Sequence, residues 1–242
     1  MPNKNINNFF FILFSLIPIS IIAGPAVSLI NVLLIDLLFL NLLIYKKEYS
    51  FLKNNIIKYL FIFYVYLLFN SFVSIDQEIG FFRNLGFLRF IVLFVAFNYF
   101  FREQNFMKNV FISWAFILFF ITIDVLFESF MGRNLVGFES PHRERIVSFF
   151  KEEPVVGGYI NSFYLIIIGF LFMNFKYKKL ILIFSIIFLF AILLTGERSN
   201  SIKALAGFII LYTFYKDYDF KKKITVGISM VILLIIIIFN SN

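Results

Sequence analysis

The sequence has no cysteine and one histidine, and charged residues make up only 15% of its 242 residues. Without cysteine, disulfides, thiol catalysis, and thiolate ligation of haem or iron–sulfur clusters are excluded. Soluble domains average about 25% charged and ~45–50% apolar residues, whereas 61% of this chain is hydrophobic and 39 residues are Phe. This composition excludes soluble enzymes and nucleic-acid-binding domains, and it predicts a polytopic membrane protein.

Long apolar runs predict the architecture. A helix that crosses a bilayer needs about 20 mostly apolar residues, and nine such runs predict an all-α bundle of about nine transmembrane helices. We expect them to form one integral membrane domain over residues 1–242. The runs lie near Phe9–Ala23, Ala26–Tyr45, Ile56–Ser74, Leu85–Phe101, Val110–Phe130, Val155–Phe175, Leu180–Thr195, Ile202–Tyr215 and Ile224–Phe239. The first run is short, and we expect Pro18 to interrupt it.

The basic residues predict the orientation of these helices. Fourteen of the 22 Lys and Arg residues fall at the N-terminus and in alternate connections, on one predicted side. By the positive-inside rule this side is cytoplasmic, and the N-terminus lies inside. The chain is therefore predicted to be a multi-pass membrane protein. Its formal net charge of +8 is a topology signal that requires no nucleic-acid partner.

Arginine is distributed differently from lysine, because six of the seven Arg residues lie on the predicted outer side or in the membrane. A guanidinium grips phosphate or carboxylate with two parallel hydrogen bonds and keeps its charge when desolvated. This distribution indicates that an anion is bound at the outer face. The alternative is that these arginines pair with the acids of the same side.

Four charged residues lie inside predicted helices. A charge at membrane depth costs about 2.5–3.5 kcal/mol on insertion scales, so such groups are usually paired. Asp124 and Glu128 share a helix face near the outer end of their helix. Arg89 enters its helix from the outer side and is expected about 9 Å deep, so we expect it to pair with one of these acids or to face a substrate headgroup. Asp36 stands alone, and one isolated acid is weak evidence for a proton relay.

The longest predicted outer connection, residues 131–153, is rich in charge. This periplasmic loop carries His142, Arg143 and Arg145, and it leads into Gly157 and Gly158 at the predicted start of the next helix. A loop folded over a helix N-terminus presents guanidinium groups, backbone N–H donors and the positive end of the helix dipole to one point. The segment therefore predicts a phosphate site, with a solvated charged loop as the alternative.

A second motif lies in the short outer turn that reads Leu-Leu-Thr195-Gly196-Glu197-Arg198-Ser199-Asn200. Gly196 is expected to end one helix, and Ser199 or Asn200 to cap the next. Arg198 then lies at a helix N-terminus, where an anion is favoured. The alternative is that Glu197 and Arg198 only cap the two helix ends.

Both motifs resemble segments of the O-antigen ligase and O-antigen polymerase superfamily. The stretch from Arg145 through Ser148 and Pro154 to Gly158 is similar to that family's R-x-x-G-x-F-x-x-P-x-x-x-G segment. The Leu-Thr195-Gly196-Glu197-Arg198 turn is similar to its L-T-G-S/E-R segment. The resemblance implies a metal-independent glycosyltransferase without a cofactor. It would be a multi-pass protein of the bacterial inner membrane. It would act at the periplasmic face on undecaprenyl-diphosphate-linked glycans, as in lipopolysaccharide biosynthesis, with a glycan or lipid A-core as acceptor.

The resemblance implies that Arg145 and Arg198 are the catalytic residues, because they match the arginines that hold the diphosphate leaving group. The remaining candidates for substrate binding are Arg89, Arg143, Glu197, Gly157 and Gly158, and no metal ligands are expected.

In one respect the chain departs from that family, which continues into a large periplasmic loop bearing a catalytic His. Here the sequence ends at Asn242, and His142 precedes the motif arginine, so it does not take that role. We expect a truncated chain or a minimal relative that binds the lipid-linked substrate and is nearly inactive alone. The alternative functions are a non-catalytic membrane subunit or remnant, and a transporter or flippase for a lipid-linked anion.

Overall fold

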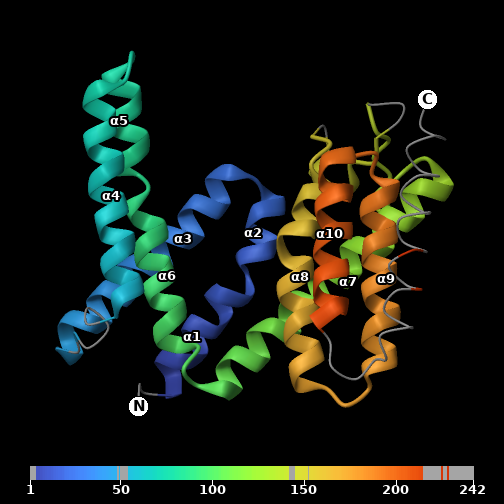
Figure 1. The fold of residues 1–242 in the computed structure, drawn as a ribbon, viewed down its shortest axis with the longest axis horizontal. Coiled ribbons are helices and arrows are strands. Elements are labelled where there is room, and N and C mark those ends of the chain that lie inside the picture. Colours follow the sequence, from blue (N-terminus) through green and yellow to red (C-terminus); the bar gives the residue numbers. More distant parts are fainter. Residues whose placement is uncertain are drawn as a thin grey trace. The chain divides into compact units, whose positions relative to one another are not determined.

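The computed structural model describes residues 4–47, 49, 54–141, 145–151 and 153–214, together with 225 and 228. Over these residues the chain is helical, without a strand, and the predicted all-α class is confirmed. The helices are α1 (Lys4–Ser15), α2 (Ile17–Ala23), α3 (Pro25–Lys46), α4 (Asn55–Val73), α5 (Gln77–Leu85), α6 (Leu88–Phe100), α7 (Gln104–Met131), the 3₁₀ turn η2 (Ser148–Phe150), α8 (Val156–Asn174), α9 (Lys178–Leu194) and α10 (Arg198–Phe214) (Figure 1).

The chain divides into two compact units, Met1–Ile112 and Ser113–Asn242, with the boundary inside α7. In the first unit α3 packs against α1, α2 and α6, and α4 packs against α5 and α6. In the second unit α8, α9 and α10 pack against one another.

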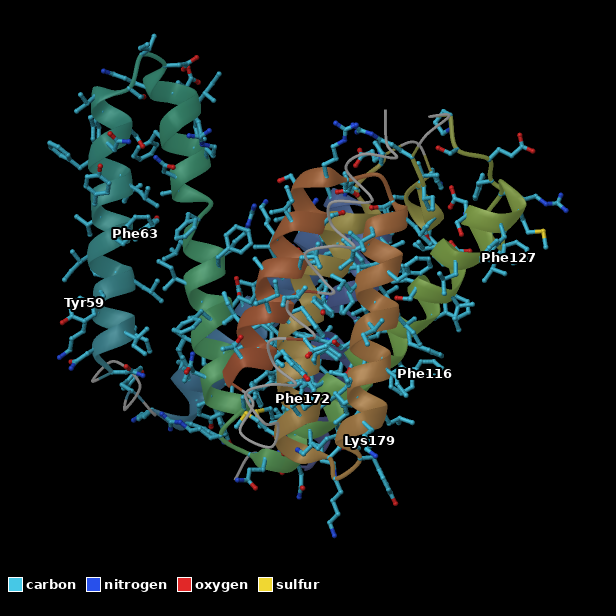
Figure 2. All side chains as sticks on the ribbon, turned by 45° about the vertical axis from the view of Figure 1, so that its right-hand side comes forward. Tyr59, Phe63, Phe116, Phe127, Phe172 and Lys179 are labelled. Carbon is cyan, nitrogen blue, oxygen red and sulfur yellow. The ribbon has the colours of Figure 1, made fainter. Side chains whose placement is uncertain are left out.

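Several helices have the length and composition of membrane spans. Five segments qualify, and the bent pair α1–α2 makes a sixth if it is counted as one span. The five are Pro25–Lys46, Asn55–Val73, Gln77–Phe100, Gln104–Met131 and Val156–Asn174. Apolar side chains such as Tyr59 of α4 and Phe116 of α7 project from their helices (Figure 2) and are 70% and 73% exposed, as suits a lipid environment.

The predicted count of nine spans is not confirmed. Helices α9 and α10 have 17 residues each, or about 26 Å at 1.5 Å per residue, slightly less than the ~30 Å hydrocarbon core. The ninth predicted helix, Ile224–Phe239, lies almost wholly outside the described residues.

In the first unit one expected interruption is observed and one expected helix start is wrong. The run Phe9–Ala23, which Pro18 was expected to interrupt, breaks at Leu16, between α1 and α2, which are bent by 45°. Proline causes this break, because Pro18 in the first turn of α2 has no N–H to continue the ladder of α1. Helical structure resumes at Gln77, well before the expected start at Leu85, because the Asp76 side chain caps α5 at the Ile79 N–H (3.1 Å).

Aromatic rings fill the core where α1, α3, α6 and the start of α7 meet. Phe14 and Phe39 are fully buried. Phe100 of α6 lies 4.3 Å from Phe10 and 5.2 Å from Phe106 between ring centroids. In the second unit the Leu165 side chain of α8 packs against α10 at Gly207, where a Cβ atom would collide with it.

Candidate functional site

Two carboxylates near the C-terminal end of α7 hold the 131–153 loop against that helix. Asp124 and Glu128 lie one turn apart and are buried. Glu128 accepts hydrogen bonds from the backbone N–H groups of Val147 (3.1 Å) and Ser148 (2.7 Å). Asp124 accepts one from the Leu135 N–H (2.7 Å) and one from the Ser148 hydroxyl (2.5 Å). All four carboxylate oxygens therefore bind the loop.

The expected pairing of Arg89 with Asp124 or Glu128 stays a prediction, because Arg89 and these acids belong to different units. Arg89 lies in the unit Met1–Ile112, where its charge acts on Asp36 of α3. Sequence reasoning expected Asp124 and Glu128 to need an arginine because both acids lie in an apolar helix. Backbone N–H groups satisfy a carboxylate as well, and no residue type in the sequence marks where such groups will gather.

Asn134 organises the first part of the loop. Its side-chain oxygen accepts hydrogen bonds from the Val136 N–H (3.1 Å) and the Phe138 N–H (2.8 Å), which closes a tight turn. Gly137 completes this turn with φ +93°, a conformation that glycine adopts without a steric penalty. The Asn134 side-chain amide donates to the Ser148 carbonyl (2.8 Å), so it joins the two ends of the loop.

Ser148 sits at the centre of this cluster in a strained conformation. Its side chain is fully buried and its φ is +50°, in the left-handed region that non-glycine residues rarely adopt. Hydrogen bonds to Asp124 and Glu128 hold it there. The segment R-x-x-G-x-F quoted above has glycine at this position, and glycine adopts a positive φ without a steric penalty. Ser148 therefore takes a backbone conformation that suits the glycine of that segment.

Two aromatic side chains that follow Ser148 fasten the loop on both sides. Phe149 stacks on Phe120 of α7, with ring centroids 5.8 Å apart and planes inclined by 6°. Phe150 packs on Tyr159 of α8, at 5.2 Å between centroids. The segment Ser148–Phe150 is therefore held between α7 and the first turns of α8.

The first turn of α8 binds a carboxylate of the α9–α10 turn. Glu197 accepts hydrogen bonds from the backbone N–H groups of Gly157 (2.6 Å) and Gly158 (3.1 Å). These N–H groups have no partner within the helix, and the helix dipole places positive potential there. The two sequence motifs thus meet directly, at the same end of the α8–α10 bundle (Figure 1).

This contact requires glycine at both positions of α8. A Cβ atom on Gly157 would collide with the Thr195 hydroxyl and lie 2.9 Å from a Glu197 carboxylate oxygen. A Cβ atom on Gly158 would lie 2.9 Å from the Asn200 side-chain nitrogen. The paired glycines therefore permit close approach of the α9–α10 turn.

The α9–α10 turn is rigid. Gly196 adopts φ +74° directly after α9, as predicted for a helix C-terminus. The Asn200 amide donates to the second oxygen of Glu197 (2.5 Å), which orients that carboxylate. The expectation that Ser199 or Asn200 caps the next helix is wrong, because α10 already begins at Arg198.

Both motif arginines are exposed. Arg145 opens the segment that leads into Ser148, and its carbonyl accepts a hydrogen bond from the Ser140 hydroxyl (2.6 Å). Arg198 is the first residue of α10 and directly follows Glu197. Two further residues singled out in the sequence, His142 and Arg143, lie outside the described residues.

Comparison with protein-family models, with curated proteins and with solved structures gives no match for this chain. In the described part of the chain, no three His, Cys, Asp or Glu side chains gather as they would around a metal ion.

Sequence reasoning missed several residues that build these clusters: Asn134, Ser148, Thr195 as a packing neighbour, and Asn200 as a partner of Glu197. One signal was available for Ser148, because the family segment has glycine there. No local pattern marks Asn134 or Asn200, since their partners lie in other segments or depend on the turn geometry.

Proposed function

We propose that the chain is a glycosyltransferase-like membrane protein that acts on undecaprenyl-diphosphate-linked glycans at the periplasmic face, in O-antigen or surface-polysaccharide ligation or polymerisation. One observation carries this proposal. The two segments that resemble the ligase and polymerase superfamily are far apart in sequence, yet they meet through Glu197 and the amides of Gly157 and Gly158.

In this proposal Arg145 and Arg198 hold the diphosphate. The bond between the anomeric carbon and the diphosphate oxygen breaks while the acceptor hydroxyl forms the new glycosidic bond, and the proton of that hydroxyl passes to the departing diphosphate or to water. The diphosphate leaves with added negative charge, and fixed guanidinium groups stabilise that charge more in the transition state than in the ground state. Arg143 is proposed to contact another part of the donor.

Glu197 and the glycines serve this site by positioning. The Gly157 and Gly158 amides already bind the Glu197 carboxylate, so they fix the turn that carries Arg198. The carboxylates on α7 bind Val147 and Ser148, and in this way they fix the position of the segment that follows Arg145. Two exposed arginines on segments held by hydrogen bonds suit recognition of a diphosphate. On binding, only the two arginine side chains lose conformational entropy, because the segments that carry them are already ordered.

A non-catalytic membrane subunit is the second candidate, and one observation favours it. The carboxylates of Asp124, Glu128 and Glu197 all engage in internal hydrogen bonds, as expected if these clusters serve stability alone. In that case the arginines would contribute to folding and would bind no lipid diphosphate.

Binding of undecaprenyl diphosphate to the purified full chain in detergent distinguishes the two candidates. We expect saturable binding that weakens by about tenfold to a hundredfold in Arg145→Ala and Arg198→Ala, because a charge-assisted hydrogen bond contributes ~1.5–3 kcal/mol. Arg133→Ala, which removes an exposed arginine of the same loop, is the matched control and should bind like the wild type. Absence of saturable binding, or equal weakening in all three variants, would overturn the proposal.

A further inference from the structure

Asp36 lies at the middle of a membrane-spanning helix. It is eleven residues from Pro25 and ten from Lys46, the ends of α3, so each end is about 15–17 Å away at 1.5 Å per residue. The hydrocarbon core of a bilayer is about 30 Å thick. If α3 spans it, the Asp36 carboxyl is therefore near the midplane.

The Asp36 carboxyl is buried and lacks a hydrogen-bond donor. Its side chain is 5% exposed, and neither carboxylate oxygen has a hydrogen-bond partner among the described residues. The polar neighbour on the same helix, Asn31, donates instead to the Leu13 carbonyl (3.3 Å) and the Ser20 hydroxyl (3.4 Å). An ionised carboxylate in such a place is costly, because nothing replaces the water that it has lost.

Arg89 of α6 supplies a positive charge that acts on this carboxyl. Helices α1, α2 and α6 pack against α3. α2 has no ionisable side chain, and the one ionisable residue of α1 is Lys4, at its N-terminus. α6 contributes Arg89 and Tyr99, and the Tyr99 hydroxyl accepts a hydrogen bond from Lys46 (3.2 Å). The charge of Arg89 is the one that acts electrostatically on Asp36.

The depth of Arg89 matches that of Asp36. The helical segment Gln77–Phe100 qualifies as one span, and Arg89 lies about 18 Å from its beginning, since it is twelve residues in. This is deeper than the ~9 Å expected from the sequence, because helical structure begins at Gln77. Asp36 and Arg89 thus lie at similar depths on two helices that pack against each other, and neither oxygen of the Asp36 carboxyl accepts a hydrogen bond from a described residue.

We propose that Asp36 is an intramembrane proton-binding site. Its carboxyl holds a proton in the resting protein and releases it to water at higher pH, and Arg89 then stabilises the carboxylate that remains. Ionisable residues inside membrane helices mark proton or ion pathways more often than structural sites. The inference is independent of the proposed glycan chemistry, because Asp36 is not among the residues assigned to the donor.

Dicyclohexylcarbodiimide tests this proposal in the purified full chain. The reagent takes the proton of a carboxylic acid at nitrogen and the carboxylate oxygen attacks its central carbon, which leaves an adduct of one reagent molecule. We expect peptide mapping by mass spectrometry to find the adduct on Asp36, with labelling that declines as the pH rises. Asp36→Asn should abolish this adduct, whereas Glu128→Gln, which alters a buried acid with hydrogen-bond donors, should leave it in place.

The role of Arg89 is tested by the pH at which labelling is half-maximal. In Arg89→Gln this pH should rise by about one unit, a tenfold gain in proton affinity, because an opposite charge no longer favours the ionised acid. Peptide mapping of the wild type gives the decisive result even if the variants fail to fold. Absence of an adduct on Asp36 at any pH, labelling that does not change with pH, or an unchanged midpoint in Arg89→Gln would each overturn the proposal.

Discussion

A carboxylate oxygen of Glu197 lies 2.6 Å from the backbone nitrogen of Gly157, forty residues earlier in the chain. This hydrogen bond joins the α9–α10 turn to the first turn of α8, and a second bond to Gly158 makes the contact two-pronged. The helix dipole strengthens both bonds, because a negative charge is favoured at a helix N-terminus. The contact therefore fixes the place where Arg198 enters α10.

Glu197→Ala should lower the free energy of unfolding by about 2–3 kcal/mol. It removes the acceptor for two helix N-terminal amides and for the Asn200 side chain, and lost helix caps and charge-assisted bonds have this magnitude. Thermal unfolding in detergent measures the change. Glu139→Ala, at an exposed acid of the 131–153 loop, should unfold like the wild type. Equal stability of the two variants would contradict the assigned role of Glu197.

Gly157→Ala and Gly169→Ala should have opposite effects on stability. Both glycines belong to α8, but a Cβ atom on Gly157 would collide with Thr195, whereas nothing lies within 4 Å of one on Gly169. Overpacking costs about 1–3 kcal/mol, and alanine gains about 0.5–1 kcal/mol over glycine inside a helix. We expect Gly157→Ala to unfold at a lower temperature than the wild type and Gly169→Ala at a higher one. A stabilised Gly157→Ala would show that the turn does not pack as closely as described.

Much of this fold follows from the sequence, because apolar runs determine where helices form. The expected boundaries of α3, α4 and α8 lie within one residue of those observed. Two features needed structural information. One is the exact place of the break, which lies at Leu16 although Pro18 was expected to interrupt this run, and the other is α5, which depends on the Asp76 cap in a short, polar segment.

The candidate site was predictable in outline only. The turn around Gly196 and the glycine pair of α8 were recognised, but a sequence does not state that Glu197 reaches across to Gly157. The same holds for Asp124 and Glu128, whose partners are loop amides. Nearly every residue has a backbone N–H, so the residue type does not show which one will bind a distant carboxylate. Sequence patterns therefore identify the carboxylate but not its partner.

Ser148→Ala should destabilise the protein more than Ser148→Gly does. Both variants lose the hydroxyl that donates to Asp124 (2.5 Å), but alanine keeps the strained φ of +50° and glycine adopts it freely. The left-handed conformation costs a non-glycine residue about 1–2 kcal/mol. The difference between the two unfolding free energies, measured by chemical denaturation in detergent, should therefore be about 1 kcal/mol in favour of glycine. A difference of zero or of the opposite sign would mean that Ser148 is not strained.

Glu128→Ala should release the 131–153 loop from α7. The substitution leaves the buried N–H groups of Val147 and Ser148 without their acceptor, and an unsatisfied buried group costs about 1–3 kcal/mol. Local opening of the loop becomes more frequent by roughly tenfold for each 1.4 kcal/mol, and proteolysis of an opened segment follows the population of the open form. Limited trypsin digestion of the purified protein should then cut after Arg145 at least about tenfold faster than in the wild type.

Glu139→Ala serves as the control, because the Glu139 side chain is exposed on the same loop and its removal should leave the cleavage rate unchanged. If Glu128→Ala were cut at the wild-type rate, the loop would be held by its aromatic contacts, and the carboxylate would contribute little to positioning Arg145.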